Sequence, residues 1–344
     1  MRSRPATPLT VATAVDVHAH AMPMPVLTWL ADRGLADLSG VEQGVVRLDP
    51  LVSGVGPGAP LPLPRSMIDP LVRLAELDAA GISHQCISLP PFLMASMATD
   101  ANLVTELMRR GSEALVDYCA AGPERLLPLA GVPIGFLSAA DTARAALDGA
   151  GVLGLAIGTR GAGQDLDAAV NTALWQLLHE RETFVLLHPS GNPAPNRLGD
   201  FWFPQLIGYP METAIAVARL AFSGVLERTP LRLCLAHGGG CLPALRGRLD
   251  LGWSRKAVAR TTRVTPSELV GDLYYDTAVF DPTSLRRLVE DVGADHVLLG
   301  TDHPFELAER DPLGFVAAAG LTPDAERQVL QGNAVRLLAG PRAG

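Results

Sequence analysis

The chain has 344 residues, of which 48% are hydrophobic, so it can bury the core of one large domain or of two smaller ones. The formal net charge of −8 argues against a surface that binds nucleic acid or an anionic membrane. No apolar run reaches the roughly 18 residues that a membrane-spanning helix needs, and we expect a cytoplasmic protein without nucleic-acid or membrane partners.

Short apolar segments alternate with helix-length segments along almost the whole chain, which is typical of parallel βαβ units. Strands are predicted at 13–20, 83–90, 125–133, 152–158, 183–189, 231–238, 272–279 and 296–303. Helices are predicted at 94–121, 138–148, 166–181, 210–227, 241–259, 282–292, 312–319 and 322–338. Eight strands with intervening helices favour an α/β fold, a distorted (β/α)8 TIM barrel, over an open doubly wound sheet.

One insertion interrupts this alternation after the first strand. Residues 21–65 end in a stretch so rich in glycine and proline that no regular element is expected between 53 and 64. We expect residues 1–344 to form one barrel domain, with this insert over the mouth of the barrel and a small hairpin around 45–48. A second irregular stretch, 190–203, follows the fifth strand and should lie at the same end.

Residues with metal-ligand chemistry stand at the ends of several predicted strands. His18 and His20 lie two apart on the first strand and therefore project to one face. Alone, this pair would equally suit two hydrogen-bonded histidines. However, His188 ends the fifth strand and Asp302 follows the eighth, and barrel strand ends converge at one face. These four residues together predict a metal site.

The sequence also limits the number and kind of metal ions. A second ion would need a bridging ligand from the fourth strand, but residues 152–158 contain neither lysine nor glutamate, and Lys256 lies in a predicted helix. One divalent cation is therefore predicted. Histidines combined with one carboxylate match zinc best, with manganese and cobalt as alternatives.

His237 begins the run His237-Gly238-Gly239-Gly240 at the end of the sixth strand. A glycine run could belong to the oxyanion hole of a serine esterase or to a phosphate-binding loop. The sequence has no G-x-S-x-G elbow and no Gly-Lys-Ser/Thr after the run, so neither reading is favoured. We interpret His237 as a general base rather than a further metal ligand, with glycines that let the backbone approach a substrate.

Several segments resemble the amidohydrolase superfamily, and within it the metal-dependent decarboxylases typified by aminocarboxymuconate-semialdehyde decarboxylase. The resemblance covers nearly the whole chain. The segments that carry it are 16–20 (DVHAH), 69–81, His188-Pro189, 222–228, 237–248 (HGGG to GR) and 300–305 (GTDHPF).

The resemblance implies a distorted barrel with a small insert and a zinc ion bound by His18, His20, His188 and Asp302. It also implies that His237 activates a zinc-bound water, with Asp302 as the second catalytic residue.

The same resemblance implies residues that bind substrate. Arg248 would reach across a homodimer interface to a substrate carboxylate, and a second arginine would come from the insert, either Arg65 or Arg47. A tryptophan that the family has after the third histidine aligns with Phe201, and the tyrosine after the metal aspartate is His303 here.

The predicted activity is non-oxidative decarboxylation of a small unsaturated or aromatic carboxylate. The alternative is a hydrolase or hydratase that uses the same zinc and base on a lactone, an amide or a C=C bond. A third reading, a binding protein with a structural metal, is disfavoured because structural zinc usually has four protein ligands and no adjacent base.

Overall fold

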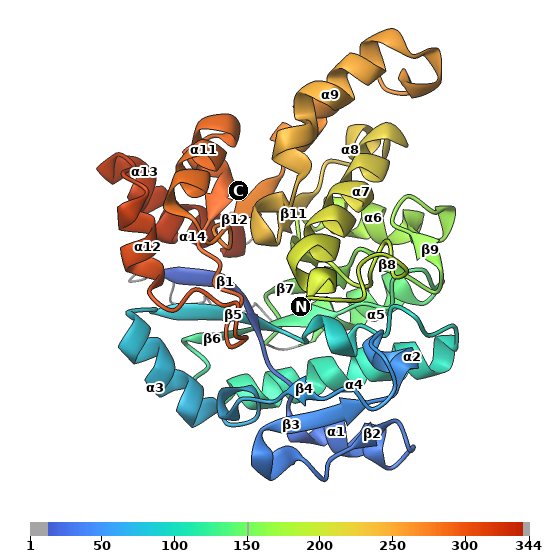
Figure 1. The fold of residues 1–344 in the computed structure, drawn as a ribbon, viewed down its shortest axis with the longest axis vertical. Coiled ribbons are helices and arrows are strands. Elements are labelled where there is room, and N and C mark those ends of the chain that lie inside the picture. The colour runs from blue at the N-terminus through green and yellow to red at the C-terminus, as the bar shows by residue number, and fades with distance from the viewer. Residues whose placement is uncertain (1–12, 150, 340–344) are drawn as a thin grey trace.

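The computed structural model describes residues 13–149 and 151–339 (Figure 1). Eight parallel strands form one sheet in the order β1-β5-β6-β7-β10-β11-β12-β13. Their bounds are Val15–His20, His84–Ser88, Leu126–Gly131, Gly154–Gly158, Phe184–His188, Arg232–Leu235, Tyr274–Asp276 and Val297–Leu298. Every predicted strand segment contains one of them, and the (β/α)8 barrel prediction is confirmed.

The barrel closes between its first and last strands. β13 is only two residues long, but the chain after it continues along β1: Val17 N donates to Leu299 O at 2.9 Å, and Asp302 N donates to His18 O at 2.9 Å. His20 N donates to the carbonyl of His303 at 2.8 Å. This closure brings Asp302 beside the two histidines of β1, although 282 residues separate Asp302 from His20.

The helices that surround the barrel have clear sequence signals at their starts. Asp69-Pro70, Asp281-Pro282 and Asp311-Pro312 each begin a helix, with the aspartate side chain accepting backbone N–H groups and proline in the first turn. The helices on the barrel are α3 (Pro70–Ala80), α4 (Ala101–Cys119), α5 (Ala139–Asp148), α6 (Thr172–Glu180), α7 (Tyr209–Phe222), α8 (Val225–Arg228), α9 (Leu242–Arg255), α10 (Pro266–Gly271), α11 (Pro282–Val292), α12 (Pro312–Ala318), α13 (Pro323–Arg327) and α14 (Asn333–Leu338).

Several predicted helices differ from the structure: the segment 166–181 is α-helical only over Thr172–Glu180, and 241–259 only over Leu242–Arg255. Three more differ for local reasons. The segment 94–121 is helical only from 101, because Asp100 caps that helix. The segment 210–227 divides into α7 and α8 at Gly224, whose φ of 74° ends a helix. The segment 322–338 holds α13 and α14 with a π-helical stretch, Gln328–Gly332, between them. Helix α10 was not predicted.

The insert has more regular structure than its composition predicts. It contains α1 (Met24–Ala31), α2 (Pro50–Ser53) and an antiparallel sheet of β2 (Ala36–Asp37), β3 (Val45–Leu48) and β4 (Leu61–Pro62). The breaker-rich stretch thus ends in a strand, because Leu61 and Leu63 are buried and pull it against the core. Figure 1 shows this unit in blue beside α4.

The remaining elements are short. β8 (Arg160–Gly161) and β9 (Gln164–Asp165) form a hairpin, and a π-helical turn spans Pro204–Gly208. The 3-10 turns are Val41–Gln43, Arg65–Met67, Pro91–Leu93, Ala169–Asn171, His237–Gly239, Ala257–Ala259 and Ala294–His296. No helix in the described part of the chain is long and apolar enough to cross a membrane.

Candidate metal centre

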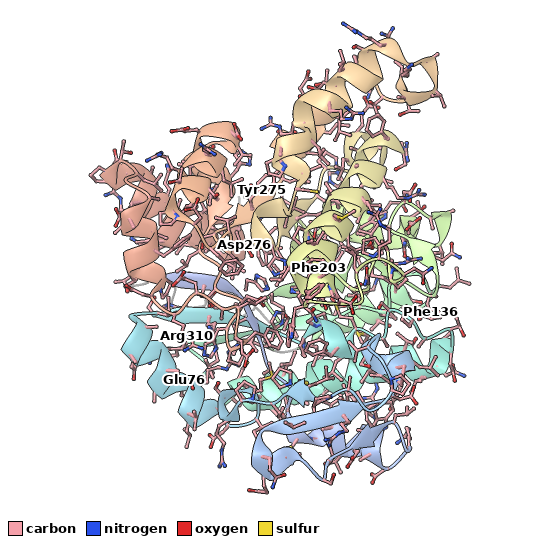
Figure 2. The ribbon with its side chains drawn as sticks, viewed as in Figure 1. Glu76, Phe136, Phe203, Tyr275, Asp276 and Arg310 are labelled. Atoms are coloured by element: carbon pink, nitrogen blue, oxygen red, sulfur yellow. The ribbon has the colours of Figure 1, made fainter. Side chains whose placement is uncertain are left out.

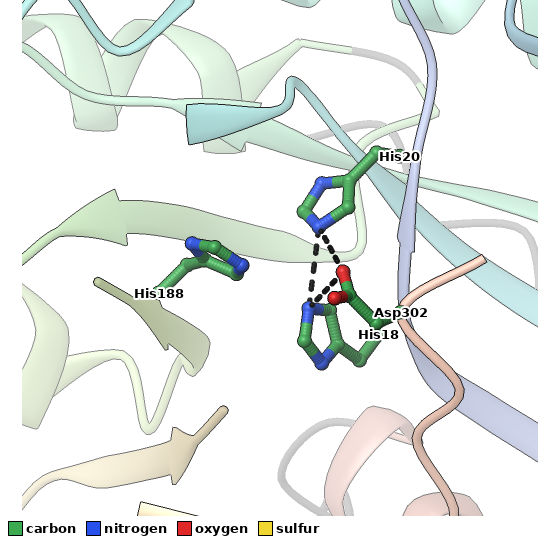
Figure 3. Close-up of side chains that lie close together, drawn as sticks. All are labelled: His18, His20, His188 and Asp302. Carbon is green, nitrogen blue, oxygen red and sulfur yellow. Dashed lines mark hydrogen bonds and ion pairs between the residues drawn. The ribbon is translucent and has the colours of Figure 1, made fainter. Parts of the chain in front are cut away.

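The structure brings the four predicted metal ligands together. One ligand atom from each of His18, His20, His188 and Asp302 lies within 4.8 Å of the others, and all four residues are buried. The Nε2 atoms of His18 and His20 are 3.2 Å apart and lie 3.2 and 3.1 Å from Asp302 Oδ1 (Figure 3). His188 approaches from β10, across the barrel from β1.

The orientation of each imidazole is fixed through its Nδ1 atom. His18 Nδ1 donates to the Asp276 carboxylate at 2.6 Å. In His20 and His188 the Nδ1 atoms lie 3.3 and 2.8 Å from backbone carbonyl oxygens. An Nδ1–H that donates outward leaves the lone pair of Nε2 directed at the centre, which is the tautomer that binds a metal.

The donor set fits a divalent cation. His188 Nε2 is buried, and no hydrogen-bond partner for it exists among the described residues. An unpaired buried polar atom is costly, so a native structure normally supplies a partner. A cation would be that partner, and three imidazoles with one carboxylate match first-row divalent ions. This cluster is the one group with such geometry in the described part of the chain.

The protonation states of most of the clustered side chains suit metal binding. Burial would raise the pKa of Asp302, but the adjacent histidines hold it well below its usual value. Burial lowers the pKa of His20 and His188. Burial also disfavours charged His18, yet the carboxylates of Asp302 and Asp276 raise its pKa to about 10. The Asp302 carboxylate is thus ionised and the His20 and His188 imidazoles are neutral, which are the forms that bind a metal, whereas His18 has to release a proton when a metal binds.

Asp276 is a site residue that sequence reasoning missed. It ends β12, and Figure 2 labels it beside Tyr275. Besides binding His18, its other carboxylate oxygen accepts the backbone N–H groups of Gly238 at 2.8 Å and Ala278 at 3.1 Å. One side chain therefore fixes both a metal ligand and the loop that carries His237. An acid at a strand end was the signal, but the predicted strand 272–279 extended past it.

His237 lies at the edge of the cluster. Its Nε2 atom is 3.5 Å from Asp302 Oδ2, and its ring centroid is 5.2 and 5.1 Å from those of His18 and His188. The side chain lines a large cavity. Its Nδ1 atom is buried without a hydrogen-bond partner among the described residues. The geometry therefore allows proton exchange at Nε2 with a molecule in the cavity.

The glycines after His237 serve the turn and its packing. His237 and all three glycines have φ between 57° and 74°. A Cβ on Gly238 would lie 2.3 Å from a Val279 methyl group, and one on Gly240 would lie 2.2 Å from the carbonyl oxygen of Pro210. These contacts are with protein atoms, and Gly240 also lines the cavity, so the close approach of a substrate to these glycines stays a prediction.

Above the cluster lies a cavity of about 910 Å³. His188, His237 and Asp302 reach it from the floor. Part of one wall comes from the insert, residues 55 and 59–62, and another from the segment after β10, including Trp202, Leu206 and Tyr209.

Backbone strain gathers around the same cavity. Eight non-glycine residues in the described chain have positive φ, and four of them line the cavity: Trp202, His237, Phe280 and Asp302. Each such conformation costs on the order of 1 kcal/mol, and proteins retain it mainly where a site requires it. The strain is an independent sign that this cavity is the functional site.

The predicted substrate residues do not line this cavity. Arg65 is exposed and pairs with Asp69 at 3.4 Å, and the nearest acid to Arg47 is Asp37 at 3.9 Å. Arg248 is exposed on α9, the helix that extends away from the barrel in Figure 1. The contacts of all three arginines with substrate stay predictions.

The aromatic residue that lines the cavity is the neighbour of the one predicted from the sequence. Phe201 is 79% exposed and does not line it, whereas Trp202 does. Both have positive φ, 55° and 59°, so the loop turns sharply at this point.

Below the cluster, a buried arginine connects the segments that carry the ligands. Arg73 on α3 is fully buried and donates to Gln85 Oε1 at 2.7 Å and to the carbonyl of His20. Gln85 in turn donates to Asp16 at 2.7 Å, and Asp16 accepts the backbone N–H of His18 at 3.0 Å. Arg73 lies in the segment 69–81 that carries the family resemblance, but no pattern marked it as buried, since most helix arginines are solvated.

His303 belongs to the same network. It points away from the metal cluster: its Nδ1 accepts from Arg73 at 3.1 Å, and its Nε2 donates to Glu76 at 2.9 Å. Burial and the charge of Arg73 lower the pKa of His303 to about 3, so it is neutral. Figure 2 labels Glu76 on α3. His303 therefore supports the loop of Asp302 from the outer side.

The chain is similar in sequence to known proteins. Residues 15–339 match the amidohydrolase family model. The chain is 29% identical to the 2-amino-3-carboxymuconate-6-semialdehyde decarboxylase of Dictyostelium discoideum, over 78% of this chain and 76% of that protein. It is 28% identical to the gamma-resorcylate decarboxylase of a Rhizobium species, over 68% of this chain and 76% of that protein.

A solved structure shows the same fold. The 5-carboxyvanillate decarboxylase LigW of Sphingomonas paucimobilis superposes with a TM-score of 0.80 at 24% identity, covering 96% of this chain and 100% of that one. The predicted resemblance to the decarboxylase branch is confirmed by the curated relatives. With the family model matched from β1 to the end of α14, the chain belongs to the amidohydrolase family.

Proposed function

We propose that this protein is a metal-dependent carboxy-lyase that removes CO₂ from a small aromatic or unsaturated carboxylate without oxidation. The observation that carries the proposal is the cluster of His18, His20, His188 and Asp302 at the floor of the cavity, with His237 beside it. The activity of the two curated decarboxylases supports the same reaction type.

The four clustered residues would hold one divalent cation, and we propose zinc because imidazoles with one carboxylate match its preferences. When bound, the cation supplies positive charge that orients the substrate carboxylate and stabilises negative charge beside the breaking bond. The cavity walls carry leucine, proline and aromatic side chains, and these apolar surroundings strengthen the electrostatic contacts.

Asp302 and His237 act together in this proposal. Oδ1 of Asp302 faces the imidazoles of His18 and His20, while Oδ2 lies 3.5 Å from His237 Nε2. The carboxylate would thus bind the metal through one oxygen and orient the His237 imidazole through the other.

His237 supplies the proton that decarboxylation requires. The C–C bond to the carboxylate breaks, its electron pair stays on the substrate carbon, and that carbon takes the proton from His237 Nε2. CO₂ leaves, and His237 recovers a proton from water. One proton is consumed for each CO₂ released, so no oxidant or reductant is needed.

Arg248 can contribute only from a second copy of the chain, because it is exposed on α9 and does not line the cavity of its own chain. We propose a homodimer in which Arg248 of one copy pairs with the reacting carboxylate in the other. A guanidinium offers two parallel N–H donors, which suits this group.

Carboxyl-labelled substrate tests the proposed reaction. The metal-loaded protein is incubated with ¹³C-carboxyl hydroxybenzoates in ¹⁸O water, and the gas and product are analysed by mass spectrometry. We expect labelled CO₂ and a product that has gained one hydrogen at the vacated carbon. Products that keep the labelled carbon and gain ¹⁸O would instead establish a hydrolase or hydratase.

A further inference from the structure

The charges along the cavity are unusual for a protein that binds a carboxylate. No lysine or arginine from residues 13–149 or 151–339 lines the cavity. Its ionisable carboxyl groups are Asp302 on the floor and Glu306 near the mouth. No ion pair of the described residues involves Glu306. Above the metal ligands, the described residues of one copy therefore give the cavity a negative charge and no positive one.

The rest of the lining is apolar and continues to the surface. Trp202, Leu206, Phe280 and Leu307 line the cavity and are 60%, 51%, 47% and 43% exposed. A volume of about 910 Å³ is near the upper end of the range for ligand pockets, and a single ring acid would fill only a part of it. The space between floor and mouth suits an apolar substituent.

We propose that the substrate is an aromatic or unsaturated acid with a single carboxylate and an apolar substituent that extends from the metal centre towards Trp202 and Leu206. The proposal rests on the proposed function, because it assumes that the carboxylate binds at the floor. A second carboxylate on the substrate would lose its hydration in the cavity and meet Glu306 instead of a cation.

The expected selectivity follows from the burial of the apolar substituent and from the desolvation of a second carboxylate. Each methylene of the substituent that the apolar wall buries should tighten binding by about fourfold. A second carboxylate in the same place should weaken binding by about tenfold or more, since no lysine or arginine among the described residues of the same copy lines the cavity to compensate for its desolvation.

Three matched probes test the selectivity on the full-length, metal-loaded protein: 2-hydroxybenzoate, its 4-propyl derivative and its 4-carboxy derivative. Dissociation constants are measured by calorimetry, and CO₂ release is measured separately. We expect the propyl probe to bind at least tenfold more tightly than 2-hydroxybenzoate, and the dicarboxylate to bind most weakly. A dicarboxylate that binds as tightly as the propyl probe would overturn the proposal.

A charge placed in the wall sharpens the test. Gln205 lines the cavity next to Leu206. Gln205→Arg should therefore tighten dicarboxylate binding about tenfold and reduce the preference for the propyl probe over the dicarboxylate. Gln176→Arg adds the same charge on the exposed side of α6 and is the matched control. Equal effects of the two variants would show that the wall does not contact the ligand and would contradict the proposal.

A second copy could still bring a positive charge to the mouth. Arg248→Ala decides this point: if it weakens binding of the dicarboxylate but not of the propyl probe, Arg248 serves a second carboxylate and the proposal is wrong.

The proposed function and the proposed selectivity can fail separately. Probes that bind in the expected order without CO₂ release contradict the carboxy-lyase function alone, whereas rapid decarboxylation of the dicarboxylate contradicts the selectivity alone.

Discussion

The floor and the mouth of the cavity are built in opposite ways. The floor consists of buried polar side chains at strand ends, and most of their hydrogen-bonding atoms have a fixed partner, as with His18 Nδ1 on Asp276. The mouth consists of loop residues such as Trp202 and Phe280, which are apolar, partly exposed and held at positive φ. Strand ends are rigid and loops tolerate change, so the floor suits the chemistry and the mouth suits the choice of substrate.

The largest effect should follow from removing a ligand at the floor. In His188→Ala the centre loses one of three imidazoles, and we expect decarboxylation to fall by about 10³-fold or more, with less than one bound metal per chain. Elemental analysis and rates of CO₂ release measure both. His179→Ala is the control, since His179 lies on α6 and bonds only the carbonyl of Pro230. A His188→Ala protein with full metal content would refute the ligand assignment.

Removing the proton donor should separate chemistry from metal binding. We expect His237→Asn to lower kcat by about 10²–10⁴-fold while one metal ion per chain is retained. Asparagine is chosen because it tolerates the left-handed φ of 57° at this position. Normal turnover in this variant would exclude His237 as the acid–base residue, and loss of the metal would make it a ligand.

A moderate effect should come from the residue that orients a ligand without joining the cluster. Asp276→Asn keeps an oxygen for Gly238 N–H but removes the negative charge beside His18. We expect metal affinity to fall about 10- to 100-fold, as measured by competition with a chelator. The control is Asp100→Asn at the start of α4, which removes one charge from an exposed residue that does not line the cavity. Unchanged affinity in Asp276→Asn would show that its contact with His18 is only structural.

The smallest effect should arise at the mouth. Trp202→Ala should raise KM about tenfold for an acid with a propyl substituent, with little change in kcat, because an apolar wall contributes to binding more than to chemistry. Phe201→Ala is the natural comparison, since Phe201 is adjacent but lies outside the cavity. A larger effect of Phe201→Ala than of Trp202→Ala would restore the sequence-based assignment of Phe201 as the substrate contact.

The same contrast explains what the sequence could predict. The four metal ligands could be predicted because strand ends converge in any barrel, so positions along strands determine positions in space. They are His18, His20, His188 and Asp302. The eight strands could be predicted from their apolar runs. Asp276 had the same signal, and it was missed only because the strand was predicted to end three residues later.

Other features had no comparable signal in the sequence. Arg73 resembles any helix arginine until the fold buries it against Gln85 and Tyr118. Whether Phe201 or Trp202 faces the cavity depends on two left-handed residues in an irregular loop, which no periodicity reveals. The positions of Arg65 and Arg47 likewise depend on how the insert folds.

Chelation followed by stepwise return of the metal tests the central claim most directly. Protein stripped of metal is titrated with zinc while CO₂ release is followed. We predict that activity disappears on stripping and returns in proportion to added zinc, reaching its plateau at one equivalent per chain. Undiminished CO₂ release from thoroughly stripped protein would contradict the single-cation centre formed by His18, His20, His188 and Asp302.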